Sequence, residues 1–81
     1  MQYAMDIKKI GDLIEQPAPP GQTWWCIDGT WYEWRQASPT VRATSRRPGL
    51  GAVPDEILPL DTPTKAAAKR AVYRHIWPDR R

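Results

Sequence analysis

The dipeptide Asp28-Gly29 lies between two runs rich in aromatic and β-branched residues, in the segment TWWCIDGTWYEWRQ. A type I′ turn needs positive φ at both central residues, and aspartate followed by glycine tolerates that geometry. The segment therefore predicts a β-hairpin with strands at 23–27 and 30–36. A two-residue turn also fixes the register of the two strands. Because four of the five tryptophans of the chain lie in this hairpin, its register decides which of them form the core.

Alternation along the two predicted strands sorts the aromatic side chains onto two faces. Trp25 lies opposite Tyr32 in the predicted register, and both share a face with Trp34, which makes this face the predicted core. Trp24 and Trp31 point to the other face. Two alternatives stay open for that pair: a helix covers it, or it stays exposed as a platform for a nucleic-acid base or for an apolar side chain of a partner.

The segments around the hairpin predict further elements. Isoleucines at three- and four-residue intervals predict a short N-terminal helix over 6–15, and a Pro-rich connector follows at 17–22. Apolar and polar residues alternate at 40–45, which predicts a third strand. Three prolines and two glycines in residues 46–61 predict a mobile loop. Pro59 within that loop excludes a central strand but permits an edge contact.

The last element is a helix expected at 63–77. Thr62 is its predicted N-cap, Pro63 stands in its first turn, and Pro78 ends it. The fold class predicted for residues 1–81 is a small single α+β domain. It consists of a two- or three-stranded antiparallel sheet built on the Trp-rich hairpin, with a short N-terminal helix and a basic C-terminal helix packed on it.

Charge is distributed unevenly along the chain. Residues 35–54 contain four arginines and no acid, and residues 62–81 contain six cations and one acid. Between them, residues 55–61 contain three acids. Such blocks indicate an anionic partner such as nucleic acid, although a solvated charged surface has the same pattern. The cations predicted to contact phosphate are Arg42, Arg46, Arg47, Lys65, Lys69, Arg70 and Arg74.

Aromatic residues accompany the second basic block. On the predicted helix, Tyr73 and Trp77 form a stripe between Lys69 on one side and Arg70 and Arg74 on the other. Aromatic side chains interleaved with cations suit a surface that follows a nucleic-acid backbone. The residues predicted to stack on bases or to bind a partner are Trp24, Trp31, Tyr73 and Trp77.

Catalytic and metal-binding chemistry has little support in the sequence. Cys26 is the only cysteine and His75 the only histidine, so neither an internal disulfide nor a four-ligand zinc site can form from them. His75 falls in the apolar stripe of the helix and is interpreted as a packed or half-exposed residue. We therefore expect no enzyme activity, no metal and no cofactor. No apolar run is long enough to span a bilayer, and a cytoplasmic protein without membrane contact is expected.

One resemblance arises from the hairpin and the helix together. The run Gly29-Thr30-Trp31-Tyr32-Glu33-Trp34-Arg35, followed by a Thr-led, Ala-rich helix, resembles the arm-binding modules of phage integrases. In that family the sheet inserts into the major groove of DNA, so the resemblance implies DNA binding through the sheet. It covers about half of the chain. The arginine comes one position late, and the segment between Ser45 and the helix is longer than in that compact pattern.

The favoured function is non-catalytic binding of DNA or RNA by a small phage or bacterial regulator that contacts phosphates through arginines. The alternative is a protein-interaction module, such as a small phage-encoded inhibitor or adaptor, that binds an acidic or apolar protein surface through the Trp-rich face. A structural subunit of a larger particle is a third class. Salt dependence separates the first two, because phosphate contacts weaken steeply with salt.

Overall fold

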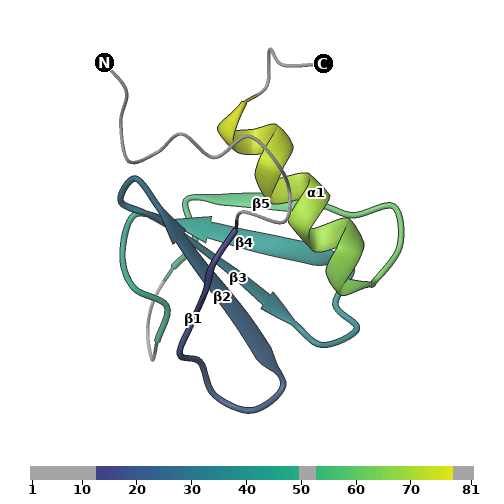
Figure 1. Ribbon diagram of the computed structural model, residues 1–81, viewed down its shortest axis with the longest axis horizontal. Coiled ribbons are helices and arrows are strands. Elements are labelled where there is room, and N and C mark those ends of the chain that lie inside the picture. Colours follow the sequence, from purple (N-terminus) through teal and green to yellow (C-terminus); the bar gives the residue numbers. More distant parts are fainter. Residues whose placement is uncertain (1–12, 50–52, 78–81) are drawn as a thin grey trace.

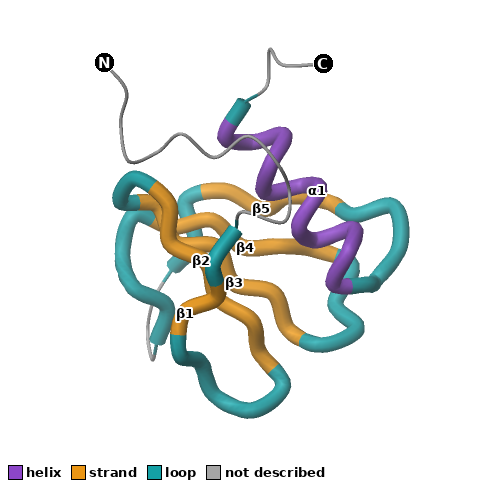
Figure 2. The backbone as a smooth tube through the Cα atoms, viewed as in Figure 1, coloured by secondary structure: helices purple, strands orange, loops and turns teal. Residues whose placement is uncertain are grey.

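The computed structural model of the chain describes residues 13–49 and 53–77. In this part of the chain one antiparallel sheet is followed by one helix, which lies on one face of the sheet (Figures 1 and 2). The sheet order β1-β2-β3-β4-β5 follows the sequence, so each strand pairs with the next along the chain. The elements are β1 (Glu15–Gln16), β2 (Gln22–Ile27), β3 (Thr30–Arg35), β4 (Thr40–Thr44), β5 (Glu56–Pro59) and α1 (Lys65–Ile76).

The hairpin and its register are confirmed. Trp25 pairs with Tyr32, as predicted, and the other β2–β3 pairs follow the same register. Asp28 has a φ of 53° and Gly29 a φ of 83°, the two positive values that a type I′ turn requires. The face of Trp25 is the core face: Trp25 is fully buried, and Tyr32 and Trp34 are almost so.

The prediction of a two- or three-stranded sheet is wrong, because the sheet has five strands. Strand β5 forms from a part of the segment that was predicted to be a mobile loop. It pairs with β4 at the edge of the sheet. Proline has no backbone N–H to donate, and an edge strand tolerates it because it has a neighbouring strand on one side only, which explains the position of Pro59. Leu58 directs its side chain into the core, whereas Ile57 points to the opposite face and is 49% exposed.

The predicted N-terminal helix over 6–15 is also wrong where the structure describes it. Leu13 and Ile14 are not helical, and Glu15 begins β1, which pairs with β2. Residues 6–12 of that predicted helix lie outside the described residues. An extended backbone places Leu13 in the core and Ile14 on the other side, and the free edge of β2 supplies hydrogen-bond partners that a helix would not use.

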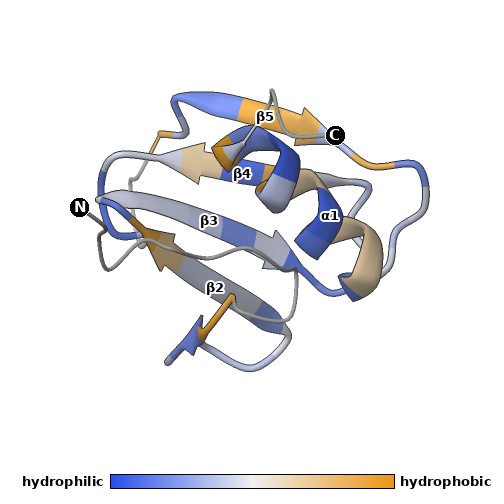
Figure 3. Ribbon diagram, turned by 45° about the horizontal axis from the view of Figure 1, so that its top comes forward, coloured by the Kyte–Doolittle hydropathy of each residue, from blue (hydrophilic) through white to orange (hydrophobic). Residues whose placement is uncertain are grey.

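Helix α1 covers the core face, as Figure 3 shows, and begins slightly later than predicted. Thr64, rather than Thr62, is the N-cap, because its hydroxyl accepts a hydrogen bond from the Ala67 backbone N–H at 3.2 Å. Ala68 and Val72 are fully buried against the sheet. Small residues at these positions allow the helix to pack closely over β3, β4 and β5. Among the described residues, no helix is long and apolar enough to cross a membrane.

We expect Gly29→Ala to lower the free energy of unfolding by about 1 kcal/mol, because an L residue is strained at this positive φ. No heavy atom lies within 4 Å of the position that the new Cβ would take, so the cost is conformational rather than steric. Urea denaturation with an unchanged m value is the measurement.

Gly49→Ala is the matched control. The space around its Cβ position is also open, but its φ is not in the positive region, so its stability should stay the same or rise slightly. Equal losses in the two variants would contradict the role given to the turn.

Candidate nucleic-acid interface

The structure divides the seven predicted phosphate-contacting cations between two surfaces. Arg42 lies on β4 opposite Glu33 and therefore shares the sheet face that points away from α1. Arg46 and Arg47 follow β4 and are exposed. The other four, Lys65, Lys69, Arg70 and Arg74, lie on α1, which covers the opposite face. One strand of nucleic acid lying on the sheet face would therefore not reach the helix cations.

The sheet face away from the helix carries the second pair of tryptophans. Trp24 and Trp31 are on adjacent strands, and their rings meet edge to face with centroids 6.2 Å apart. Trp24 is only 6% exposed, and its indole N–H donates to the Gln22 side-chain oxygen at 2.9 Å. Trp31 is half-buried. An exposed platform made of both rings is therefore not present: Trp31 is accessible and Trp24 is not.

Arg47 lies over this tryptophan pair. Its guanidinium carbon is 5.7 Å from the centroid of Trp24 and 5.8 Å from that of Trp31, within the range of a cation–π interaction. The cover of the pair thus includes an arginine from the segment after β4, which sequence reasoning did not foresee. A guanidinium that stacks on aromatic rings keeps the N–H groups at its planar edge available for a bidentate anion.

A fourth arginine belongs to the same face and was missed among the phosphate-contacting candidates. Trp31, Glu33 and Arg35 are every second residue of β3 and therefore point to the same face, so the position of Arg35 in the strand could have identified it. Its Nε donates to the Glu33 carboxylate at 3.2 Å while its side chain stays 59% exposed. Arg35, Arg42 and Arg47 lie on this face, and Arg46 is exposed next to Arg47 in the sequence. Two carboxylates lie near these arginines: Glu33, and Asp55, which accepts from the Ser45 backbone N–H at 2.9 Å. The arginines outnumber the carboxylates, so the charge of this set is positive. We call the set of Trp31, Arg35, Arg42, Arg46 and Arg47 the arginine face.

Helix α1 carries the second basic surface. Tyr73 and Trp77 lie with ring centroids 5.1 Å apart and planes tilted by 50°, which confirms that they form one stripe. Arg70 and Arg74 are exposed beside them and Lys69 is half-buried. The helix Lys65–Ile76 contains no acidic residue. Lys65 forms an ion pair with Glu15, so part of its charge is compensated.

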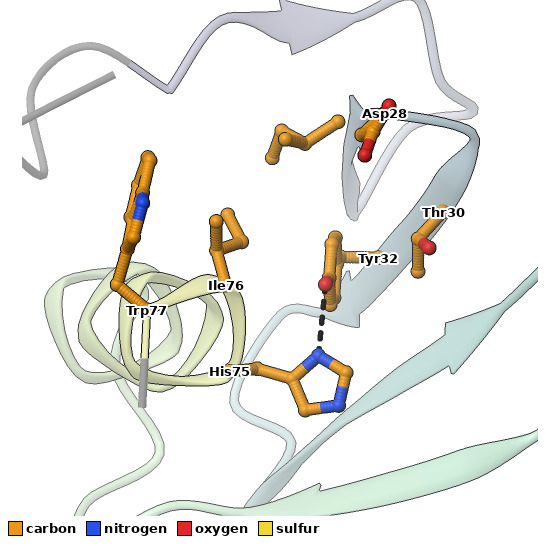
Figure 4. Close-up of a pocket in the computed structure, with 7 residues that line it drawn as sticks. Asp28, Thr30, Tyr32, His75, Ile76 and Trp77 are labelled. Atoms are coloured by element: carbon orange, nitrogen blue, oxygen red, sulfur yellow. Dashed lines mark hydrogen bonds between the residues drawn. The ribbon is translucent and has the colours of Figure 1, made fainter. Parts of the chain in front are cut away.

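A hydrogen-bonded chain ties the end of α1 to the sheet. Tyr32 Oη lies 2.8 Å from His75 Nδ1 (Figure 4). On the other side of the ring, His75 Nε2 lies 2.9 Å from a Glu56 carboxylate oxygen. Since the carboxylate accepts, Nε2 donates to it. In the neutral imidazole Nδ1 then accepts the hydroxyl proton of Tyr32. His75 is half-exposed, as interpreted from the sequence. Its partners were not foreseen, because Glu56 belongs to the strand that was predicted to be a loop.

The hydrogen bonds from Tyr32 through His75 to Glu56 do not activate the tyrosine. Burial first, and the negative charge of Glu56 second, raise the pKa of Tyr32 to about 12. The phenol therefore stays protonated at ordinary pH and is a poor nucleophile. Cys26 is a free, half-buried thiol. Within residues 13–49 and 53–77, no three His, Cys, Asp or Glu residues come together in a way that could hold a metal ion.

Comparisons with known protein families, with curated proteins and with solved structures gave no match. They lend no support to the resemblance to the arm-binding modules of phage integrases. The functional argument therefore depends on the geometry of this chain.

The raised pKa of Tyr32 predicts a loss of stability at alkaline pH. Between the unfolded value of 10.0 and the folded value of about 12, the folded state keeps a proton that the unfolded state has lost. The stabilisation is complete below pH 10 and disappears as the pH rises toward 12, by up to roughly 2 kcal/mol. Urea denaturation over this range should show the loss in the native protein and not in Tyr32→Phe.

Thr62→Ala is the control for this measurement. It removes an exposed hydroxyl that does not belong to a tyrosine and whose described hydrogen bond is to Thr64, so it should leave the alkaline loss of the native protein unchanged. If Tyr32→Phe loses as much stability above pH 10 as the native protein does, the assignment of the effect to Tyr32 is wrong.

Proposed function

We propose that the chain is a non-catalytic protein that binds single-stranded nucleic acid through the arginine face. The observation that carries the proposal is the position of Arg47, whose guanidinium lies within 6 Å of the centroids of two indole rings. Stacking restrains a long side chain that would otherwise lose rotamer entropy on binding. The restrained guanidinium is already positioned to donate hydrogen bonds from its planar edge to a phosphate.

The neighbouring residues support a nucleic-acid strand rather than an isolated anion. Arg46 is exposed next to Arg47 in the chain, and Arg35 and Arg42 lie on β3 and β4 of the same face. Several arginines along one surface can follow successive phosphates. The ring of Trp31 among them offers a surface on which a base can stack.

The accessible ring of Trp31 favours a single strand over a duplex. Bases of a single strand can splay onto aromatic side chains, whereas those of a duplex are stacked on each other. Phosphate contacts and stacking both tolerate many sequences, so the proposal includes DNA and RNA. The proposal places the protein in the cytoplasm, where the lone Cys26 would stay reduced.

Charge reversal of Arg46 and Arg47 together should weaken the binding of a fluorescent single-stranded oligonucleotide by about tenfold or more at low salt. Loss of two phosphate contacts should also reduce the slope of log K against log salt by about 1.4. Fluorescence anisotropy across a salt series measures both.

The matched control reverses Arg70 and Arg74, which changes the net charge equally but on the opposite side of the molecule. This control should keep most of the affinity. If it loses as much affinity as the Arg46/Arg47 variant, or more, the interface is not the arginine face. Binding that fails for every oligonucleotide at low salt would end the proposal altogether.

Trp31→Ala tests the stacking contribution separately. Removing the ring should weaken single-stranded binding by about 1 to 3 kcal/mol, the range found for stacking on one aromatic residue. Duplex binding should change less, because paired bases do not reach the ring. An equal loss for the two nucleic acids in the same anisotropy assay would contradict stacking on Trp31.

A protein partner is the second candidate, favoured by two exposed isoleucines. Ile57 is 49% exposed on β5, where it pairs with Arg42, and alternation places Ile14, which is 73% exposed, on the same face. An apolar partner held by these side chains and Trp31 would bind with little dependence on salt. The salt series described above separates this candidate from nucleic-acid binding.

A further inference from the structure

A pocket opens between the end of α1 and the turn of the hairpin, on the opposite side of the sheet from the arginine face. Its volume is about 350 Å³, within the range of small-molecule sites. Figure 4 shows Ile76 and Trp77 rising from the end of the helix on one side and Tyr32 and Asp28 from the hairpin on the other. The proposed nucleic-acid site uses none of these residues.

The lining combines an apolar body with groups that accept hydrogen bonds. Ile27, Ile76 and Trp77 supply the apolar walls, and the Asp28 carboxylate lies at the rim. Among the described residues, the lining contains no lysine or arginine, and Asp28 is its one carboxylate. Such a composition favours a positively charged ligand over a neutral or anionic one.

The hydrogen bonds from Tyr32 through His75 to Glu56 also favour a ligand that donates hydrogen bonds. Both nitrogens of His75 are occupied, one by Tyr32 and the other by Glu56. With His75 neutral, Tyr32 donates its proton to Nδ1, so its oxygen can only accept from a ligand. A ligand with N–H donors matches this oxygen and the Asp28 carboxylate, whereas a ligand that offers only acceptors would leave both without a partner.

The walls of the pocket are held in place before any ligand arrives. Asp28 is the first central residue of the turn, with a φ of 53°, and the turn fixes its backbone. Trp77 is the C-cap of α1, where its backbone N–H donates to Tyr73 O at 3.0 Å. The contact of His75 with β3 and β5 anchors this end of the helix. A preformed site lowers the entropic cost of binding.

We propose that this pocket binds a small organic cation, in particular a primary amine carried on an apolar or aromatic body. The ammonium group pairs with the Asp28 carboxylate and donates to the Tyr32 oxygen. The body of the ligand lies against Ile76 and the ring of Trp77, which also attracts a cation through its face.

Benzylamine and benzyl alcohol provide the test, because the two probes have similar size and differ in charge. Titration of the full chain, followed by two-dimensional ¹H–¹⁵N NMR, reports on each indole N–H separately. Benzylamine should shift the Trp77 indole signal and the amides of the hairpin turn, and the Trp31 signal should stay in place as an internal control. Benzyl alcohol should bind about fivefold to tenfold more weakly.

Asp28→Asn tests the charge directly, since asparagine also tolerates positive φ. This variant should bind benzylamine and benzyl alcohol about equally, while Asp61→Asn, at an exposed acid outside the pocket, should keep the preference for the amine. Trp77→Leu keeps an apolar side chain without the ring and should weaken the amine severalfold. The dispersion of the amide signals shows whether each variant is folded.

Three results would overturn the proposal. The first is the absence of any shift at Trp77 on addition of benzylamine. The second is equal affinity of the native protein for the amine and the alcohol. The third is a preference for the amine that survives in folded Asp28→Asn. None of these results bears on binding at the arginine face, so this test and the oligonucleotide titrations succeed or fail independently.

Discussion

The turn at Asp28 and Gly29 determines which side chains of β2 and β3 face the helix and which face the other side of the sheet. Its two positive φ values set the β2–β3 register, and a shift of one residue would exchange the buried and exposed sets of aromatic side chains. With this register, Trp25 lies under the helix and Trp31 lies on the other face among arginines. One local backbone geometry thereby separates the core of the domain from its candidate interface.

The hairpin and the helix could be predicted because their signals are local. A turn dipeptide, side-chain alternation and helix-forming residues act over a few positions, and they located β2, β3, β4 and α1. The two edge strands depend on distant partners instead. Glu15 and Gln16 extend because β2 offers a free edge, and residues 56–59 extend because β4 does. The run around Pro59 was compatible with an edge contact, but neither short run shows in its own sequence which strand it pairs with.

The candidate site shows the same limit. Charge blocks identified the arginines and alternation placed Trp31 on the outer face, but the sequence could not show that the helix cations lie on the opposite side of the sheet. Contacts between distant residues were also beyond it. Arg47 stacks on a ring 23 positions earlier in the chain, and Tyr32 bonds to a histidine 43 positions later. Such contacts follow from the strand order of the whole sheet.

The bridge made by His75 has a consequence for the order in which the chain assembles. Its two partners are 43 and 19 positions away and belong to β3 and β5, which flank β4 on either side. Neighbouring strands of the meander meet through short loop closures, which are fast, whereas the histidine closes the longest loop among them. The loop lengths therefore predict that the last helical turn docks late in folding, after the neighbouring strands have paired.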